Sequence, residues 1–104
     1  MTMGTVEVPN EELRTLCHKW RINRLALFGS ALTGQLHPDS DIDLLVEFEP
    51  GEQWSLMDLV RAEAEFASLF GRHVDLVDKS SLQRSSNWMR RDAILNTAEV
   101  IYAA

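Results

Sequence analysis

Apolar residues in the first quarter of the chain follow a helical pattern first and a strand-like pattern after it. A set spaced by three and four residues predicts a first helix after Asn10, and it comprises Leu13, Leu16, Cys17 and Trp20. The run 22–28, INRLALF, is short and largely apolar and stops at Gly29, which predicts a buried strand. We expect Ser30 to cap one helical turn that reaches Thr33, ahead of the turn residues HPDS.

The middle of the chain alternates between two sets of positions. Residues 41–48, DIDLLVEF, predict a strand with Ile42, Leu44, Val46 and Phe48 on one face and Asp41, Asp43, Leu45 and Glu47 on the other. Ser55 and Asp58 then resemble a capping box and predict a helix that ends at Gly71. We expect the core-facing stripe of this helix to comprise Leu56, Leu59, Val60, Ala67 and Phe70.

The last third of the chain predicts one more strand and one more helix. Residues 73–77, HVDLV, form a short strand in which Asp75 faces away from Val74 and Leu76. The closing helix is expected to carry an apolar face of Trp88, Leu95, Ala98 and Tyr102, with Ile94 and Ile101 beside it. The order helix, strand, strand, helix, strand, helix indicates a two-layer α+β fold, a small mixed β-sheet with helices on one face. The carboxylates would lie on the open face.

Size and charge narrow the classes of protein that this chain can belong to. Its 104 residues, 45% of them hydrophobic, suit a single domain over residues 1–104. A net charge of −6 at pH 7 disfavours binding to long nucleic acids. The single cysteine, Cys17, fits a reducing compartment, and no apolar run is long enough to span a bilayer. We therefore expect a cytoplasmic protein that does not bind a membrane.

The polar face of the second predicted strand suggests a metal site. Asp41 and Asp43 are two residues apart, so both side chains point the same way, about 6.5 to 7 Å apart along the strand. Two like charges so close destabilise the fold unless a divalent cation lies between them. Carboxylate oxygens are ligands that Mg²⁺ prefers, and Asp75 on the next strand is the candidate for a third.

Gly29 and Ser30 suggest a phosphate site opposite these carboxylates. Glycine lets a backbone approach a ligand closely, and N–H groups at the start of a helical turn bind anions. Each feature alone is common, since Gly-Ser pairs and Asp-x-Asp turns occur in many chains. Their combination, in this order and each next to an apolar strand, favours a site that binds a nucleotide and a metal.

The stretch FGS…DSDIDLLVEF followed by GRHVDLV resembles the minimal nucleotidyltransferase family, within the polymerase β-like nucleotidyltransferase superfamily. The resemblance implies the nucleotidyltransferase fold and transfer of AMP from ATP to a hydroxyl with two Mg²⁺ ions. Carried over to this chain, it implies that Asp41 and Asp43 bind metal and that Asp75 binds metal or helps to deprotonate the acceptor. Gly29 and Ser30 would hold the β- and γ-phosphates.

Many members of that family are antitoxins encoded with a HEPN-domain toxin. The resemblance therefore implies that this chain adenylylates a hydroxyl of such a toxin, commonly a tyrosine, and silences it. We expect a hetero-oligomer with the toxin, although a homodimer could take its place. Transfer to a small molecule such as an aminoglycoside is less favoured, because enzymes of that class carry an additional helical domain.

One departure from the family pattern supports an alternative function. Family members often read Gly-Ser-Arg-x-Arg-Gly, whereas this chain has Ala31 and Thr33 at the arginine positions. The alternative is a catalytically weak antitoxin that neutralises its toxin by stoichiometric binding. Internal cations could also replace the arginines, and the candidates are Lys79, Arg84, Arg90 and Arg91.

Overall fold

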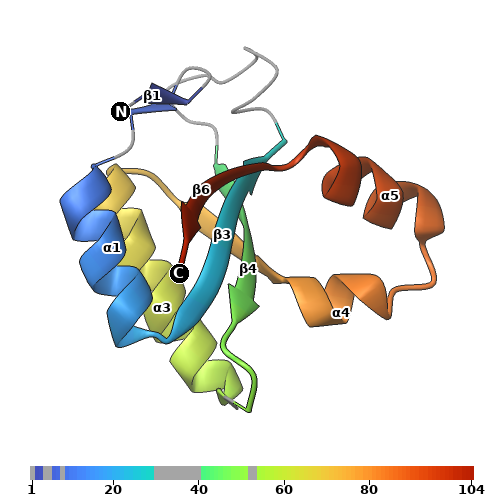
Figure 1. The fold of residues 1–104 in the computed structure, drawn as a ribbon, viewed down its shortest axis with the longest axis horizontal. Coiled ribbons are helices and arrows are strands. Elements are labelled where there is room, and N and C mark those ends of the chain that lie inside the picture. The colour runs from blue at the N-terminus through green and yellow to red at the C-terminus, as the bar shows by residue number, and fades with distance from the viewer. Residues whose placement is uncertain (1, 4–5, 8, 30–40, 52–53) are drawn as a thin grey trace.

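A computed structural model describes residues 2–3, 6–7, 9–29, 41–51 and 54–104 of the chain (Figure 1). The expected helical turn at 30–33, and Ser30 with it, lies outside the described residues. In chain order, the described part contains β1 (Thr2–Met3), β2 (Val6–Glu7), α1 (Asn10–Lys19), β3 (Ile22–Phe28), β4 (Ile42–Phe48), α3 (Leu56–Phe70), β5 (Val74–Asp78), α4 (Lys79–Gln83), α5 (Trp88–Thr97) and β6 (Glu99–Ala103).

The main sheet has four strands in the order β5-β4-β3-β6. β3 runs antiparallel to both β4 and β6, whereas β4 and β5 are parallel. β1 and β2 form a separate antiparallel pair. The sheet is therefore mixed, as the sequence predicts, and its parallel pair joins the two strands that carry the acidic residues.

The large hydrophobic core lies between one face of the sheet and the helices α1 and α3 (Figure 1). Ile42, Leu44 and Val46 of β4 are fully buried in it, which confirms the apolar face predicted for this strand. Cys17 is also fully buried there, and this burial raises the pKa of its thiol to about 12. The cysteine is part of the core, as expected.

The other face of the sheet carries a second, smaller cluster. Leu82 of α4 and Ile94 of α5 pack against Ala26 and Phe28 of β3 and Leu45 of β4. The predicted fold class is confirmed, with this refinement: α4 and α5 cover part of the face that the sequence leaves open. Asp43 lies on this face too, next to the cluster, because Phe28 is its register partner and Leu45 follows it by two residues.

The predicted stripe of α3 is partly wrong. Ala62 and Phe66 are the buried residues of this helix, whereas Leu56 and Val60 are 77% and 52% exposed. Ala67 and Phe70 do pack against the core, as predicted. The predicted capping box of Ser55 and Asp58 and the end of the helix at Gly71 are both confirmed.

The end of the chain differs from the prediction. α5 ends at Thr97, and residues 99–103 form the strand β6, so Ile101 and Tyr102 do not belong to the helix. β6 pairs with β3, and Ile101 is buried in the large core. The sequence also missed the short helix α4, which Asp78 caps through a hydrogen bond accepted from the Ser80 N–H.

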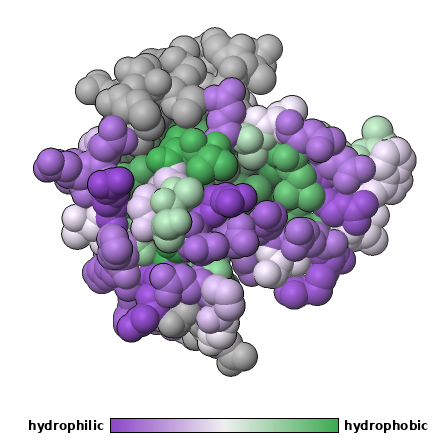
Figure 2. All heavy atoms as spheres, in the orientation of Figure 1, coloured by the Kyte–Doolittle hydropathy of each residue, from purple (hydrophilic) through white to green (hydrophobic). Residues whose placement is uncertain are grey.

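The outer surface agrees with the acidic, polar composition. Hydrophilic side chains predominate on the face drawn in Figure 2, and apolar ones are visible only in limited groups. Of the helices that the structure describes, none has the length and apolar character needed to cross a membrane.

Candidate active site

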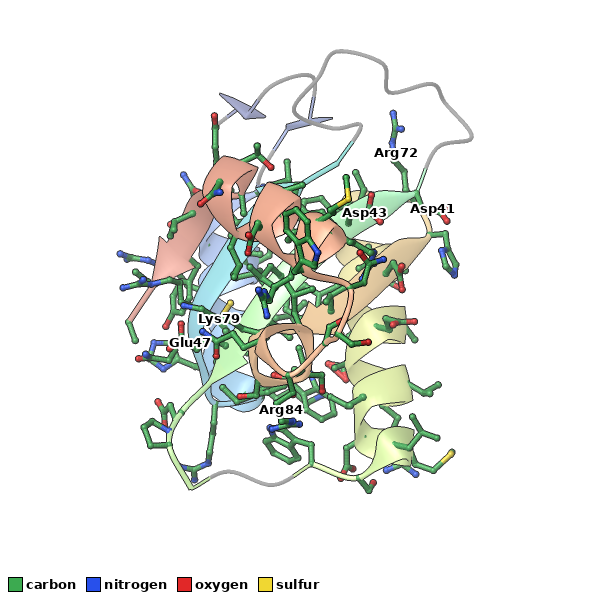
Figure 3. The ribbon with its side chains drawn as sticks, turned by 90° about the vertical axis from the view of Figure 1, so that its right-hand side faces the viewer. Asp41, Asp43, Glu47, Arg72, Lys79 and Arg84 are labelled. Atoms are coloured by element: carbon green, nitrogen blue, oxygen red, sulfur yellow. The ribbon has the colours of Figure 1, made fainter. Side chains whose placement is uncertain are left out.

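Asp41, Asp43 and Asp75 lie near one another at one end of the parallel strand pair. Asp43 of β4 is the direct register partner of Asp75 of β5. Both lie on the face opposite the buried Ile42 and Leu44, and Asp41 immediately precedes β4. Figure 3 shows Asp41 and Asp43 at the same end of the sheet. The structure thus brings together the acidic residues that the sequence selects.

The charges of the neighbouring residues act on the carboxyl group of Asp43. Partial burial raises the pKa of Asp43, and the negative charges of Asp75 and Asp41 raise it further. The positive charge of Arg90 acts in the opposite direction and lowers the pKa of the same group. Asp43 is therefore the centre of the acidic group, close to two anions and one cation.

Gly29 closes the site on the side of β3. Its φ angle is +78°, and a Cβ atom built at this position would lie 2.5 Å from Oδ2 of Asp43. The preceding residue, Phe28, is the register partner of Asp43 across the antiparallel pair. The left-handed backbone favours glycine here, and a Cβ atom would also force the carboxylate of Asp43 to shift. The backbone of Gly29 therefore lies directly against the central aspartate.

His73 is a neighbour of the site that sequence reasoning missed. Its Nδ1 lies 3.3 Å from Oδ1 of Asp41, and its backbone carbonyl accepts a hydrogen bond of 2.9 Å from the Ile42 N–H. The histidines of the sequence do not have the spacing of metal ligands, so the sequence alone gives no signal for His73. His73 directly precedes β5, and the pairing of β5 with β4 is what brings it next to Asp41.

The four candidate cations differ in where they lie. Lys79 is paired with Glu47, with Nζ and Oε2 3.4 Å apart, and Figure 3 shows this pair and Arg84 well away from Asp43. Arg91 is paired with its neighbour Asp92, with Nε and Oδ1 3.3 Å apart. Arg90 is the one whose charge acts on Asp43.

The acidic residues have the chemistry of a divalent-cation site. Asp43 and Asp75 supply hard carboxylate oxygens from adjacent strands. A bound cation would remove the repulsion between their negative charges. Within the described part of the chain, no three His, Cys, Asp or Glu side chains already converge on one point. The residues fit Mg²⁺ by donor type, and the carboxylates would have to draw together around it.

Residues 10–101 match the family model of the nucleotidyltransferase domain. This chain belongs to that family. The match spans α1 to β6 and therefore includes every described residue of the acidic site. The predicted enzyme class, a nucleotidyltransferase, is confirmed.

A curated relative and two solved structures are similar to this chain. The protein adenylyltransferase MntA of Thermococcus cleftensis is 39% identical over 70 residues, which cover 67% of this chain and 69% of the relative. The resemblance to the minimal nucleotidyltransferases is confirmed by this relative together with the family match.

Both solved structures are toxin–antitoxin complexes. One contains AMP-PNP, and its matching chain has a TM-score of 0.70 at 21% identity, covering 93% of this chain and 75% of that one. The other is a tri-AMPylated HEPN toxin of Shewanella oneidensis with an MNT antitoxin, with a TM-score of 0.60 at 18% identity and coverage of 91% and 70%. At these identities the likeness shows a shared fold.

Proposed function

We propose that this chain is a Mg²⁺-dependent protein adenylyltransferase that acts as an antitoxin in the cytoplasm. It transfers AMP from ATP to a hydroxyl, which we expect to be that of a tyrosine, on a HEPN-type toxin. The observation that carries the proposal is the in-register pair Asp43 and Asp75, with the backbone of Gly29 against Asp43. The 39% identical relative is named a protein adenylyltransferase, which supports the same activity.

The proposed reaction assigns a role to each residue of the site. Asp41, Asp43 and Asp75 would hold two Mg²⁺ ions, which supply positive charge for the phosphates and for the attacking oxygen. Gly29 permits the backbone to approach the β- and γ-phosphates, and Ser30 adds a hydrogen-bond donor. The acceptor oxygen forms a bond to the α-phosphorus, the bond to the β-phosphate breaks, and pyrophosphate leaves. The acceptor proton goes to Asp75 or to water.

The comparisons favour a protein as the acceptor. The 39% identical relative is named a protein adenylyltransferase. A protein brings its own surface, so binding to the partner and presenting the hydroxyl can occur together. Both structural neighbours described above are complexes of an antitoxin with its toxin, which supports a partner of this kind. We therefore propose a hetero-oligomer with the toxin.

The test is the mass of the partner after reaction. The purified chain is incubated with the protein encoded beside it and with Mg-ATP, and intact-protein mass spectrometry follows the partner. We expect the mass to rise by one or more adenylates with the wild-type chain. With Asp41→Ala/Asp43→Ala, folded by circular dichroism, no adenylate should appear. An unchanged partner mass with the wild-type chain would refute the proposed activity.

A second candidate function is neutralisation by binding alone. The observation in its favour is that residues 29–40 contain neither lysine nor arginine, so the segment after β3 offers no cation to a triphosphate. The same double variant separates the two functions in cells that express the toxin. Full neutralisation by the double variant would favour masking, and its loss would favour catalysis.

A further inference from the structure

Arg90 lies over the acidic end of the sheet because of how α5 packs. Arg90 and Ile94 are four residues apart in α5, so they lie on the same side of the helix. Ile94 is buried against Phe28 and Leu45. Phe28 is the register partner of Asp43, and Leu45 follows Asp43 by two residues on the same face. The packing of Ile94 thus holds the side of α5 that bears Arg90 above this part of the sheet.

Electrostatics agree with this placement. Among the charges that act on Asp43, Arg90 provides the cation, while Asp75 and Asp41 provide the anions. Arg90 is exposed, and within the described part of the chain it has no ion-pair partner. An exposed guanidinium beside a group of carboxylates, without a carboxylate of its own, is available to an incoming anion.

The sequence around the site increases the need for such a cation. The segment 29–40 contains no lysine or arginine. A nucleoside triphosphate that binds beside the three aspartates adds several negative charges to theirs, so positive charge is needed there. Lys79 and Arg91 are each engaged with a carboxylate, and Arg84 lies far from Asp43 (Figure 3). Arg90 is therefore the candidate of the four that can face a phosphate at this site.

We propose that Arg90 binds a phosphate of the nucleotide and supplies, from α5, positive charge that the segment after β3 lacks. Arginine suits this role because its planar guanidinium donates two parallel hydrogen bonds to a phosphate. The inference rests on the proposed function, since it assigns a substrate-binding residue to the same site. It also requires that α5 be in place on the sheet before nucleotide binds.

The test compares single variants of the full chain in their binding of AMP-PNP with Mg²⁺, measured by isothermal titration calorimetry. Arg90→Gln should weaken binding by roughly tenfold to a hundredfold, the usual effect of losing a hydrogen bond to a charged group. Arg90→Lys should restore part of the affinity, because the charge returns without the two-pronged geometry. The matched control is Arg91→Gln, the next residue in the helix, which should bind within about twofold of wild type. Circular dichroism melting confirms that each variant is folded.

The outcomes separate this inference from the proposed function. If wild type binds AMP-PNP and Arg90→Gln binds it equally well, the role of Arg90 is refuted and the proposed function stands. If Arg90→Gln and Arg91→Gln lose affinity to the same extent, the effect is one of overall charge, and the specific role of Arg90 is again refuted. If wild type binds no AMP-PNP with Mg²⁺, the nucleotide site itself is refuted, and this inference with it.

Discussion

Gly29 links backbone conformation directly to the central aspartate. A Cβ atom at this position would lie 2.5 Å from Oδ2 of Asp43, whereas one at Gly71 would meet nothing within 4 Å. The two glycines have similar φ angles, +78° and +68°. Their alanine variants should therefore suffer the same backbone strain, about 1 to 2 kcal/mol each, and differ only in the contact with Asp43.

We therefore expect Gly29→Ala to abolish adenylylation and Gly71→Ala to preserve it. Urea unfolding should show a loss of about 1 to 2 kcal/mol for Gly71→Ala and a larger loss for Gly29→Ala, because the carboxylate must also move. The measurements are the rate of adenylate transfer and the free energy of unfolding. Equal activity of the two variants would show that the close approach at Gly29 does not matter.

Asp43 should destabilise the fold when no metal is present. Its pKa is raised above the ordinary 3.8 by burial and by Asp75 and Asp41, so the ionised form is less favourable in the folded state than in the unfolded state. The penalty is fully present at pH values above the raised pKa, and it disappears as the pH falls below 3.8. We therefore predict that, without metal, the acidic site lowers the free energy of unfolding at neutral pH.

The Asp43→Asn variant tests whether the ionised Asp43 destabilises the fold. In EDTA at pH 7, its melting temperature should exceed that of the wild type, and the difference should shrink as the pH is lowered toward 4. Added Mg²⁺ should then stabilise the wild type more than the variant, because the variant has lost a ligand. A lower melting temperature for Asp43→Asn in EDTA at pH 7 would contradict the raised pKa.

At the scale of single elements, α3 shows what spacing predicts well and what it does not. The helix ends were predictable, because the capping box and the left-handed Gly71 are local features. The buried stripe was not predictable, because most residues from Leu56 to Phe70 are apolar or small and more than one side of the helix could face the core. Packing against the sheet determines which side of the helix is buried, and that side carries Ala62 and Phe66.

Two alanine variants test this selection. Phe66→Ala should cost about 3 to 5 kcal/mol of unfolding free energy, because Phe66 is completely buried. Leu56→Ala should change it by less than about 0.5 kcal/mol, because Leu56 is 77% exposed. Chemical denaturation of the isolated chain provides both values. A large cost for Leu56→Ala would mean that the predicted stripe was right.

The C-terminal strand could not be found from the sequence for a similar reason. Residues 99–103, EVIYA, are short, and their apolar residues fit both a helical and an alternating pattern. What makes them a strand is pairing with β3, in which Leu25 faces Tyr102 and Ala26 faces Val100. This partner lies more than seventy residues earlier in the chain, and no local spacing reports it.

For the whole molecule, the acidic site was predictable to the extent that it follows strand periodicity. The spacing of Asp41 and Asp43 and the glycine after an apolar strand are properties of short segments. The proximity of Asp43 to Asp75 depends on the parallel register of β4 and β5, and that of Arg90 on the packing of Ile94. His73 beside Asp41 is the clearest omission, since only the assembled sheet edge brings the two together.

The most direct test of the account is a crystal structure of the chain with AMP-PNP and Mn²⁺ in place of Mg²⁺. Anomalous scattering locates the manganese independently of the protein atoms. We expect manganese to be bound by Asp41 and Asp43, with Asp75 turned toward it and the nucleotide phosphates beside Gly29. Manganese absent from these carboxylates while AMP-PNP is bound elsewhere, or Asp75 turned away from the ions, would contradict it.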